Sequence, residues 1–433
     1  AMKAKITLTM IVVGLTLLLA ATASATNGDN LIGVGPISRA MGGVGIASPQ
    51  DAISAVFSNP AAMCFGPYCP ASQFDFAGTL FMPHVEARIS RANGEVTAES
   101  DEKVYAIPAI GFSMPMGDGS DWRFGLSAYG VTGLGVDYRG TAIDNPKGFD
   151  FSGQGKGPFA PLVAGEFTSL QIMKFAPAVG YALSSNLSLG IALHIDYSSL
   201  DLRNGSSFGY GFGVQPGLIY KPIDNLSLGL TYSTPQSVDH ENVNDFDQDG
   251  TLDDLELEAP QQFGAGIAYE FSKVLVETNL KWINWSGAAG YEDFDWDDQW
   301  VFSIGAQVEA VDNLFLRAGY NYGENPLKTH DGFDGSFNPA TGRPNDAVDV
   351  QGTTIPRYYY ETFRMIGFPA VVEHHLTLGA GYHFTERLGI HAGYVRAFEK
   401  SVSQKGTDLY GMPVELESTL SEDSIEFGLS YRF

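Results

Sequence analysis

The chain ends on Ile425-Glu-Phe-Gly-Leu-Ser-Tyr-Arg-Phe433, a stretch that indicates the fold of the whole molecule. Apolar or aromatic side chains occupy every second position, and polar or small residues lie between them. Successive side chains of a β-strand point to opposite faces, so this stretch would have one apolar face and one polar face. Such a strand suits a transmembrane β-barrel, in which one face contacts lipid and the other faces a wet lumen.

The same alternation recurs upstream, for example from Leu187 to Tyr197 and from Leu376 to Phe384. It predicts an all-β chain with about fourteen antiparallel strands, and single-chain bacterial barrels have an even number. A soluble β-sandwich would rarely place tyrosines so often at strand ends, where a membrane interface favours them. The predicted strands are 72–90, 102–115, 122–136, 165–183, 187–198, 211–221, 226–234, 257–270, 274–283, 299–310, 314–322, 372–384, 387–399 and 423–433.

The connections between these strands alternate in length. Short periplasmic turns and long outer loops are the asymmetry expected of such a barrel. The predicted outer loops include 199–210 and 400–422, and the predicted turns include 184–186 and 385–386.

Composition narrows the class of protein. The 433 residues include 50 acidic and 25 basic side chains, giving a net charge of −25. This balance argues against a nucleic-acid partner, because phosphates are bound by clustered Lys and Arg. The 51 glycines and the 12% of aromatic residues suit many strands and tight turns.

The start of the chain predicts export. Lys3 and Lys5 precede an apolar run from Ile6 to Ala21, and Ala23-Ser-Ala25 follows it. A charged start, a short apolar segment and a small-residue site are typical of a secretory signal peptide, predicted here over residues 1–25. A transmembrane helix fits less well because the run is short. With the barrel pattern, this predicts the outer membrane of a Gram-negative bacterium.

Residues 26–71 lack strand alternation and are rich in Gly, Ala and Ser. A barrel of fourteen strands encloses more space than its own side chains fill. We therefore expect this segment to lie in the lumen as a plug, followed by a barrel over 72–433. The alternative is a disordered periplasmic tail, against which the apolar content argues. Cys64 and Cys69 predict a disulfide, because the periplasm is oxidising.

This segment carries a family resemblance. It contains Gly33-Val-Gly35, Arg39-Ala-Met-Gly-Gly43, Asp51-Ala-Ile-Ser-Ala55 and Asn59-Pro60-Ala61. The string resembles the N-terminal hatch of the long-chain fatty-acid outer-membrane transporter family (FadL-type). The resemblance implies passive uptake of hydrophobic molecules through a lumen pocket, hatch movement and lateral exit at a kinked third strand. It also implies hatch or gating roles for Arg39, Asn59, Pro60 and Ala61; the cysteine pair is not part of the family pattern.

The third predicted strand has the composition of a kink. It contains Gly125, Gly130, Gly133 and Gly135, and glycine in a strand marks bulges and bends. Its neighbours carry Pro108 and Pro177, which cannot donate to a ladder. We expect a lateral opening in the wall here. The alternative is that these residues only relieve barrel curvature.

Residues 245–256 match the calcium-loop template D-x-[DN]-x-[DN]-G-x₅-E. Carboxylates at the first, third and fifth positions, with a bidentate Glu at the twelfth, would surround a hard cation with oxygen. The alternative is a solvated acidic loop. The predicted ligands of a structural calcium ion in an outer loop are Asp245, Asp247, Asp249, Thr251, Asp253 and Glu256.

Alternation places several cations on the inner face of the barrel. A fatty acid needs an apolar channel and one or two cations for its carboxylate. Lys174, Lys281 and Arg317 are the predicted substrate-binding residues, and Arg432 also points inward. Apolar residues for an extracellular groove would come from the long loops: Phe149, Phe151, Phe159, Tyr358, Phe363 and Phe368.

The predicted function is an outer-membrane channel, not an enzyme, for hydrophobic compounds such as long-chain fatty acids. Uptake of aromatic hydrocarbons and general diffusion through a porin are the alternatives. Gly205-Ser-Ser-Phe-Gly209 fits the hydrolase pattern G-x-S-x-G, but no helix follows to form the nucleophile elbow. We expect a monomer whose partners are a hydrophobic small molecule and the outer-membrane lipid or lipopolysaccharide.

Overall fold

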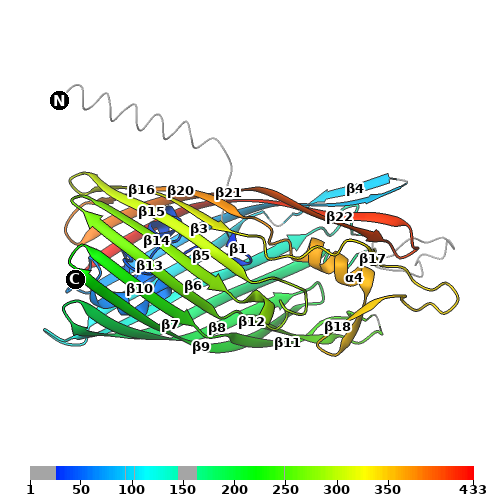
Figure 1. Cartoon of the computed structure of the whole chain (residues 1–433), viewed down its shortest axis with the longest axis horizontal. Helices are drawn as coiled ribbons and strands as arrows, with labels where there is room; N and C mark the ends of the chain where they lie inside the picture. The colour runs from blue at the N-terminus through cyan, green and yellow to red at the C-terminus, as the bar shows by residue number, and fades with distance from the viewer. Residues whose placement is uncertain (1–25, 93, 102, 145–162, 248) are drawn as a thin grey trace, which may run out of the picture.

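The computed structural model describes residues 26–92, 94–101, 103–144, 163–247 and 249–433. In this part of the chain, fourteen long antiparallel strands form a closed barrel (Figure 1). They are β3 (Gln73–Arg91), β5 (Tyr105–Pro115), β6 (Trp122–Asp137), β7 (Phe167–Ser184), β8 (Leu187–Asp201), β9 (Ser206–Ile223), β10 (Leu226–Ser233), β13 (Gln262–Phe271), β14 (Val274–Ile283), β15 (Gln299–Val311), β16 (Leu314–Gly323), β20 (His374–His383), β21 (Leu388–Thr407) and β22 (Pro413–Arg432).

The barrel closes where the last strand meets the first. Strand β22 pairs with β3 in continuous antiparallel register, from Val414 opposite Arg91 to Arg432 opposite Gln73. Each remaining wall strand pairs with its neighbours in chain order. The predicted fourteen-stranded antiparallel barrel is therefore confirmed.

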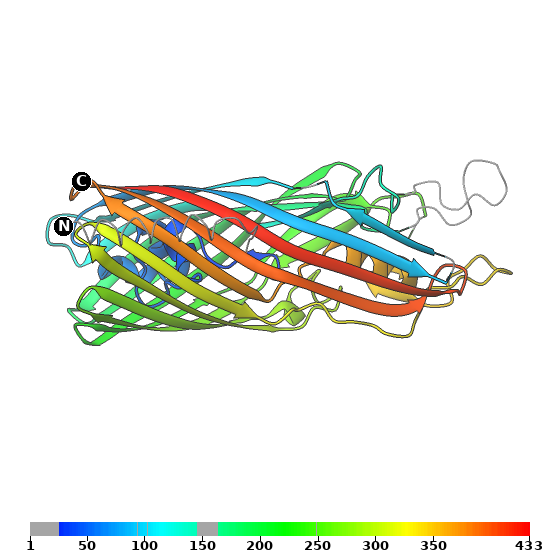
Figure 2. The ribbon, with the colours of Figure 1, turned by 90° about the horizontal axis from the view of Figure 1, so that it is seen from above.

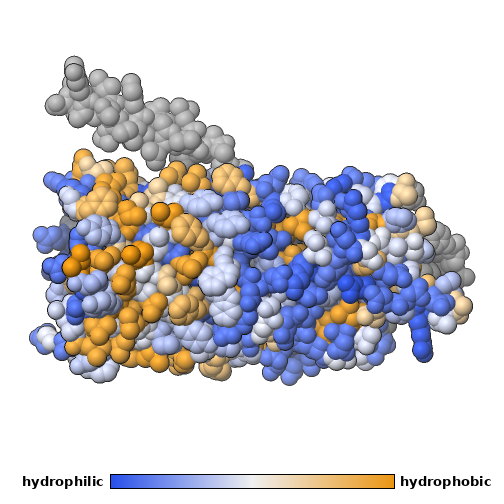
Figure 3. All heavy atoms as spheres, viewed as in Figure 1, coloured by the Kyte–Doolittle hydropathy of each residue, from blue (hydrophilic) through white to orange (hydrophobic). Residues whose placement is uncertain are grey.

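The predicted alternation sets which side chains face outward. In β8, Leu189 and Ile191 are 43% and 46% exposed, whereas the next residue, Ala192, points to the opposite face and is fully buried. In β22, Phe427 is 51% exposed and Glu426 is 1% exposed. Outward-facing apolar residues gather over one half of the barrel's length, and the other half is hydrophilic (Figure 3). An apolar band of this kind is the surface that a bilayer covers.

Two predicted outer loops proved to be strand. Strands β21 and β22 continue to Thr407 and back from Pro413, so 400–422 is mostly a hairpin, and β9 already begins at Ser206. Figure 2 shows β21, β22 and β3 extending well past the other strands. In their outer halves the apolar residues, such as Val414, Leu416 and Leu420, are buried on the inner face, and the outward face is polar. The apolar outward face of a lipid-facing strand is therefore missing there. At about 3.4 Å per residue, a twenty-residue strand greatly exceeds the bilayer thickness.

The outer end of the barrel carries additional elements. Strand β4 (Gly94–Glu99) pairs with β3, and two hairpins are formed by β11 (Gln236–Asn244) with β12 (Asp253–Ala259) and by β18 (Ala347–Val350) with β19 (Thr353–Pro356). The predicted strand 257–270 is thus two strands separated by Pro260, which cannot donate to a ladder. Strand β17 (Phe333–Asp334), helix α4 (Arg357–Thr362) and the π-turn η3 (Phe363–Gly367) belong to the same region, and the 3₁₀ turn η2 (Trp285–Gly287) follows β14.

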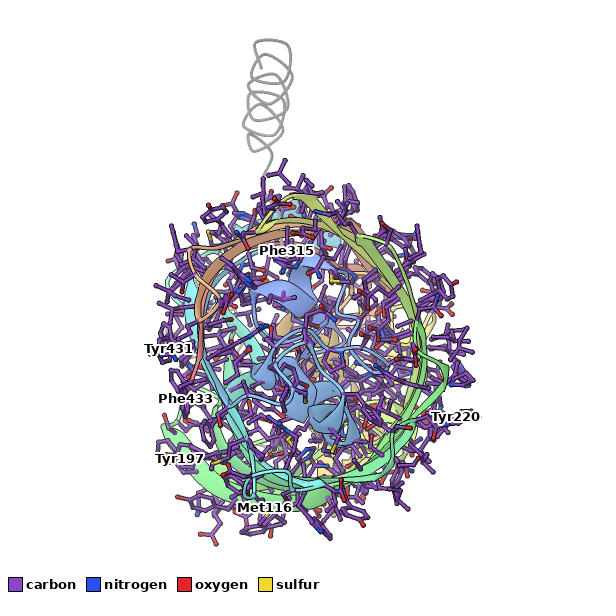
Figure 4. The ribbon with its side chains drawn as sticks, turned by 90° about the vertical axis from the view of Figure 1, so that its left-hand side faces the viewer. Met116, Tyr197, Tyr220, Phe315, Tyr431 and Phe433 are labelled. Carbon is purple, nitrogen blue, oxygen red and sulfur yellow. The ribbon has the colours of Figure 1, made fainter. Side chains whose placement is uncertain are left out.

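Residues 26–71, called the hatch from here on, lie inside the barrel. The hatch contains β1 (Thr26–Asn27), β2 (Asn30–Leu31), α2 (Pro36–Ala40), α3 (Ala52–Ser58) and the 3₁₀ turn η1 (Pro60–Cys64). Figure 4 looks along the barrel from the end with the short turns, and the hatch helices appear within the ring of strands. Most hatch residues up to Met63 are buried, which matches a plug and not a disordered tail.

Inward-facing glycines let the hatch lie against the wall. A Cβ on Gly190 would overlap Ala61, and one on Gly319 would overlap the backbone at Gly42. Wall residues Gly217 and Gly229 face the hatch in the same way. Part of the high glycine content therefore serves the contact between hatch and wall. Among the described helices, none has the length and apolarity needed to cross a membrane.

Candidate functional site

Asn59 joins the hatch to two strands of the wall. Its side-chain amide donates to the carbonyl oxygens of Leu218 in β9 and Leu230 in β10, at 3.1 and 3.2 Å. It also donates to Ile46 O, and its Oδ1 accepts from Ala61 N at 3.1 Å. One side chain therefore satisfies four backbone groups. The residue begins η1, with Pro60 at the first position, where the missing N–H costs nothing.

Arg39 joins the hatch to the last strand. Its guanidinium forms a fully buried ion pair with Glu426 and donates to Ser424 Oγ at 2.6 Å. At the start of the hatch, Thr26 Oγ1 donates to Glu422 Oε1 at 2.9 Å. Both acids belong to β22, so the C-terminal strand holds two separate points of the hatch. Asn59, Pro60, Ala61 and Arg39 thus lie at hatch–wall contacts, where residues that control hatch movement would have to lie.

The predicted disulfide between Cys64 and Cys69 is absent, and both thiols are free. Cys69 Sγ lies 2.9 Å from Met63 O, whereas Cys64 Sγ faces the wall at Gly180 in β7. The two sulfur atoms therefore point in different directions, although five positions separate the residues in sequence.

The wall is interrupted between the second and third barrel strands. Strand β5 pairs with β6 only from Pro115 opposite Arg123 to Ala109 opposite Tyr129. Beyond Tyr129, β6 runs on to Asp137 and stays paired with β7, but it no longer pairs with β5. Its register with β7 shifts at Gly130, which is a bulge.

The same half of β6 has turned into the barrel. Alternation of buried and partly exposed residues holds up to Tyr129, and then Gly130, Val131 and Thr132 are all buried. Thr132 pairs with Asn30 of β2, so the hatch contacts this bent strand directly. A strand buried on both faces has left the lipid-facing surface. Backbone pairing between β5 and β6 is therefore lost beside Gly130–Asp137, where the Ile107 and Tyr105 side chains of β5 lie against Gly130 and Gly135. We call this stretch the lateral gap.

The glycines and prolines predicted at the opening have different roles. Gly130, Gly133 and Gly135 lie in the bent half, and Pro108 immediately precedes the last β5 residue paired with β6. Gly125 lies below the bend, where a Cβ would overlap Met63 of the hatch. Pro177 interrupts the pairing of β7 with β8, one strand away from the gap.

A cavity in the lumen reaches this bent strand. Its walls come from the hatch, from β6 at Tyr129 and Val131, and from the wall strands β7 to β10, β13 and β14. It combines aromatic and aliphatic surface with several polar groups, the composition of a site for a partly apolar ligand. The lining residues include Asn30, Ile46, Phe57, Tyr129, Val131, Lys174, His194, Gln215, Gln236, Pro260 and Lys281.

Lys174 and Lys281 both line this cavity, but their surroundings differ. Lys174 Nζ lies 3.1 Å from Asp196 Oδ2 and also hydrogen-bonds Gln236. Its charge is therefore neutralised by the wall. Lys281 has no ion pair within the described residues. Lys281 is thus the cation that remains available for an anionic group in the cavity.

Arg317 lies elsewhere, so the structure does not bring the three predicted cations together. It contacts Gln307 in a second cavity near the short turns, together with Arg432. Alternation fixes the face of a strand on which a residue lies, but its depth depends on the tilt and stagger of each strand. The lumen residues His194 and Gln215 lie within the predicted strands 187–198 and 211–221, whereas Gln236 belongs to a hairpin that the sequence pattern did not indicate.

The aromatic residues predicted for an extracellular groove close the barrel instead. Tyr358, Phe363 and Phe368 are buried, and the Phe363 ring lies 4.9 Å from that of Phe294. Glu361 and Arg364 form a buried ion pair beneath them. This packed layer of α4 and η3 covers the outer end of the lumen. Phe149, Phe151 and Phe159 lie outside the described residues, as does the predicted signal peptide.

The predicted calcium loop forms the tip of the β11–β12 hairpin. The carboxylates of Asp245, Asp247 and Asp253 converge within 4.8 Å of one another, so an exposed Asp triad capable of holding a cation is present. Asp249 instead accepts from Thr251 N at 2.8 Å. Glu256 lies three residues along β12 from Asp253, which at about 3.3 Å per residue carries it away from the triad.

Three solved structures resemble the whole chain. The Pseudomonas putida toluene transporter TodX is 18% identical, with 94% of this chain and 100% of that chain covered and a TM-score of 0.64. The Ralstonia pickettii toluene transporter TbuX is 16% identical, with 93% and 98% covered and a TM-score of 0.63. A Pseudomonas aeruginosa FadL homologue is 15% identical, with 95% and 100% covered and a TM-score of 0.63.

No protein-family model and no curated protein sequence matches the chain. The structural likeness extends over nearly the full length of each of the three proteins, hatch and barrel together. The chain therefore has the fold of the FadL-type outer-membrane channels.

Proposed function

We propose that this protein is a passive channel that takes up hydrophobic compounds across the outer membrane. The observation that carries the proposal is the gap between β5 and β6 beside a cavity in a plugged lumen. A hydrophobic molecule gains by moving into the apolar membrane interior instead of the watery periplasm. A lateral gap at the level of the bilayer supplies that route. Three proteins of the same fold include two described as toluene transporters.

The hatch makes uptake depend on a conformational change. Asn30 of β2 pairs with Thr132 at the bend, and the α3–η1 part of the hatch contacts β6 lower in the wall. A ligand leaving the cavity toward the gap must displace the β2 contact. We therefore assign Arg39 and Asn59 the role of holding the hatch in its closed position while β2 moves.

Within this function, we favour an amphipathic ligand whose anionic group contacts Lys281. The cavity holds a lysine without a counterion among the described residues, next to Phe57 and Tyr129. A carboxylate would form a charge-assisted hydrogen bond there, which is stronger than a neutral one. A monoaromatic hydrocarbon is the second candidate, favoured by the toluene transporters of the same fold.

Uptake of labelled oleate and labelled toluene by cells that carry the protein separates these candidates. Lys281→Met should reduce oleate uptake and leave toluene uptake unchanged. Lys273→Met, on an exposed periplasmic turn, is the matched control because it removes the same charge outside the cavity. Unchanged oleate uptake in Lys281→Met would remove the carboxylate assignment, and absence of saturable uptake of either compound would overturn the channel itself.

We also propose that the Asp245–Asp247–Asp253 triad binds calcium as a structural ion. Burial and the charges of Asp247 and Asp249 raise the pKa of Asp245, which shows that the carboxylates repel one another at this tip. A cation would relieve that repulsion. Millimolar calcium should raise the thermal stability of the purified protein, and Asp245→Asn should abolish the increase. Asp239→Asn, an exposed change on the same hairpin, should retain it; an equal calcium effect in all three proteins would exclude the site.

A further inference from the structure

A second cavity opens at the periplasmic end of the barrel, away from the lumen cavity. It lies between the hatch, at Ile37 and Gln50, and the wall around the β20–β21 turn. Phe315, at its rim, is labelled in Figure 4, which views this end directly. The cavity has a volume of about 220 Å³, which is room for a small solute and several waters.

Among the charged side chains that line this cavity, cations outnumber anions, because three arginines, Arg317, Arg387 and Arg432, lie there. Two histidines, His383 and His391, line it as well. The one acid among the lining residues is the exposed Glu386. Within the described residues, none of the three arginines forms an ion pair. Three arginines without ion pairs thus lie together in a chain that has twice as many acidic as basic residues.

Buried polar atoms in the cluster lack partners. Arg317 is 5% exposed, and its Nη1 has no hydrogen-bond partner, although its Nε donates to Gln307 Oε1 at 2.6 Å. His391 Nδ1 is also buried without a partner, while Nε2 lies 3.1 Å from Ser430 Oγ. A desolvated guanidinium without an acceptor is costly, and such groups usually mark a missing acceptor.

Nearby acids already have other partners. Asp51, the acid that interacts electrostatically with Arg317, caps α3 by accepting from Ser54 N at 2.6 Å. Asp75 accepts from Ala52 N at 2.7 Å and from Gln73. Neither carboxylate lines the cavity. Apart from this electrostatic interaction with Asp51, Arg317 has no carboxylate partner among the described residues, and its Nη1 lacks an acceptor beside a solvent-connected space.

We propose that this periplasmic cavity is a binding site for a small oxyanion, either a carboxylate or a phosphate, held by Arg317 with Arg432 at its edge. A guanidinium presents two parallel N–H groups that match the oxygen atoms of either anion. Because the cavity is lined by both hatch and wall, the bound anion joins them. Anion binding therefore stabilises the closed hatch from the periplasmic side. The site is separate from the lumen cavity and does not depend on the ligand proposed there.

Binding is tested on the purified full-length protein at constant ionic strength. Inorganic phosphate and acetate are titrated separately, with chloride as the reference, and thermal stability and calorimetric heat are recorded. We expect saturable binding of at least one oxyanion, weakened roughly tenfold or more in Arg317→Gln, since a charge-assisted hydrogen bond contributes about 1.5–3 kcal/mol. Arg139→Gln, an exposed change at the other end of the barrel, should bind as the wild type does.

The two anions identify the source of the ligand. Binding of phosphate alone points to a phosphate compound, and binding of acetate alone points to an organic acid. If Arg317→Gln does not fold, Arg432→Gln tests the same site from its edge and should weaken binding in the same direction. Titrations in which neither anion differs from chloride, or in which both variants bind as tightly as the wild type, overturn the proposal.

Discussion

At the scale of single residues, missing Cβ atoms determine how closely the hatch can approach the wall. Gly190, Gly217 and Gly319 lie on three different strands, and each faces hatch backbone or the Asn59 side chain. Backbone cannot move aside as a flexible side chain can. These positions therefore require glycine because of the plug, although their own strands would be stable with alanine.

Gly319→Ala tests this requirement. The added methyl group would overlap the backbone at Met41 and Gly42, and overpacking of this kind costs about 1–3 kcal/mol. We expect faster hydrogen exchange of hatch amides near Met41. Gly133→Ala is the control, because a Cβ there has no neighbour within 4 Å. Equal exchange in both variants would mean that the hatch does not press on the wall.

The buried pair of Arg39 and Glu426 allows a second test at this scale. Arg39→Met leaves Glu426 buried without its partner, which typically costs about 3–5 kcal/mol. The double variant Arg39→Met/Glu426→Met should recover much of that loss, because no charge then remains buried. Thermal unfolding of the wild type, of Arg39→Met, of Glu426→Met and of the double variant measures the difference. Additive losses in the double variant would show that the ion pair is not the anchor.

The sequence predicted which residues face inward but not how they group. Lys174, Lys281 and Arg317 all lie on the inner face, as alternation requires. Only the first two share a cavity, because strand tilt places Arg317 nearer the periplasm. The alternation pattern did not reveal the partner of Lys174. Asp196 lies opposite Lys174 on the neighbouring strand, and the register between two strands cannot be obtained from one strand alone.

At the scale of elements, the bent half of β6 is the part of the wall that differs from a regular barrel. Its glycines predicted the kink, and the loss of pairing with β5 occurs at the first of the three in the bend. The sequence could not show that β2 of the hatch pairs with this strand, since that contact joins residues 102 positions apart.

A disulfide between β2 and β6 tests whether this contact must open. Asn30 and Thr132 are directly opposed, at a spacing that a disulfide can bridge. Asn30→Cys/Thr132→Cys, in a background with Cys64→Ser and Cys69→Ser, should lose uptake when oxidised. Reduction should restore it, because the hatch strand is then free to move. Full uptake by the oxidised protein would place the exit route elsewhere.

Helix α4 at the outer end is held by a charge network centred on Glu361. Its carboxylate accepts from Arg364 and Gln404, at 2.9 and 2.7 Å, and pairs with Arg357 and His330. Burial alone would raise the pKa of Glu361. The His330 hydrogen bond and the Arg364 charge outweigh it, so the pKa lies below its ordinary value of 4.5.

This network predicts acid sensitivity of the outer layer. A depressed pKa stabilises the folded state above the ordinary value, and that contribution is lost as pH falls below 4.5 through the folded pKa. Limited proteolysis of the 324–373 region should therefore accelerate in this acid range. Glu361→Gln should be cleaved faster already at neutral pH and show a flatter pH profile. An unchanged profile in the variant would assign the sensitivity to other acids.

At the scale of the whole molecule, the barrel and the hatch were predictable and the outer end was not. The lipid-facing half repeats one simple pattern, so strand count and closure follow from it. In the outer half, the outward face of β21 and β22 is polar, and apolar residues such as Leu416 and Leu420 lie on the inner face. Such strands lack the apolar outward face by which lipid-facing strands are found in a sequence. The α4 layer depends on contacts among segments far apart in the chain, which no local pattern reports.

A plugged lumen separates this protein from a general porin. Because the hatch fills the barrel, we expect little ion conductance in planar bilayers. Replacing 34–58 with a short Gly-Ser linker should produce large, steady openings, since the wall closes through β22 and β3 without the hatch. Asp245→Asn, far from the lumen, should stay closed. Large openings of the intact protein would favour the porin alternative.

The two hatch anchors on the last strand also have a consequence for biogenesis. Glu422 lies 396 positions after Thr26 and Glu426 lies 387 positions after Arg39, so both acids belong to a strand that is synthesised after the other thirteen wall strands. The hatch therefore cannot settle until the final strand has been inserted beside the first. Barrel closure and docking of the hatch are then one event. In an unfinished barrel, Arg39, Glu422 and Glu426 lack their buried partners.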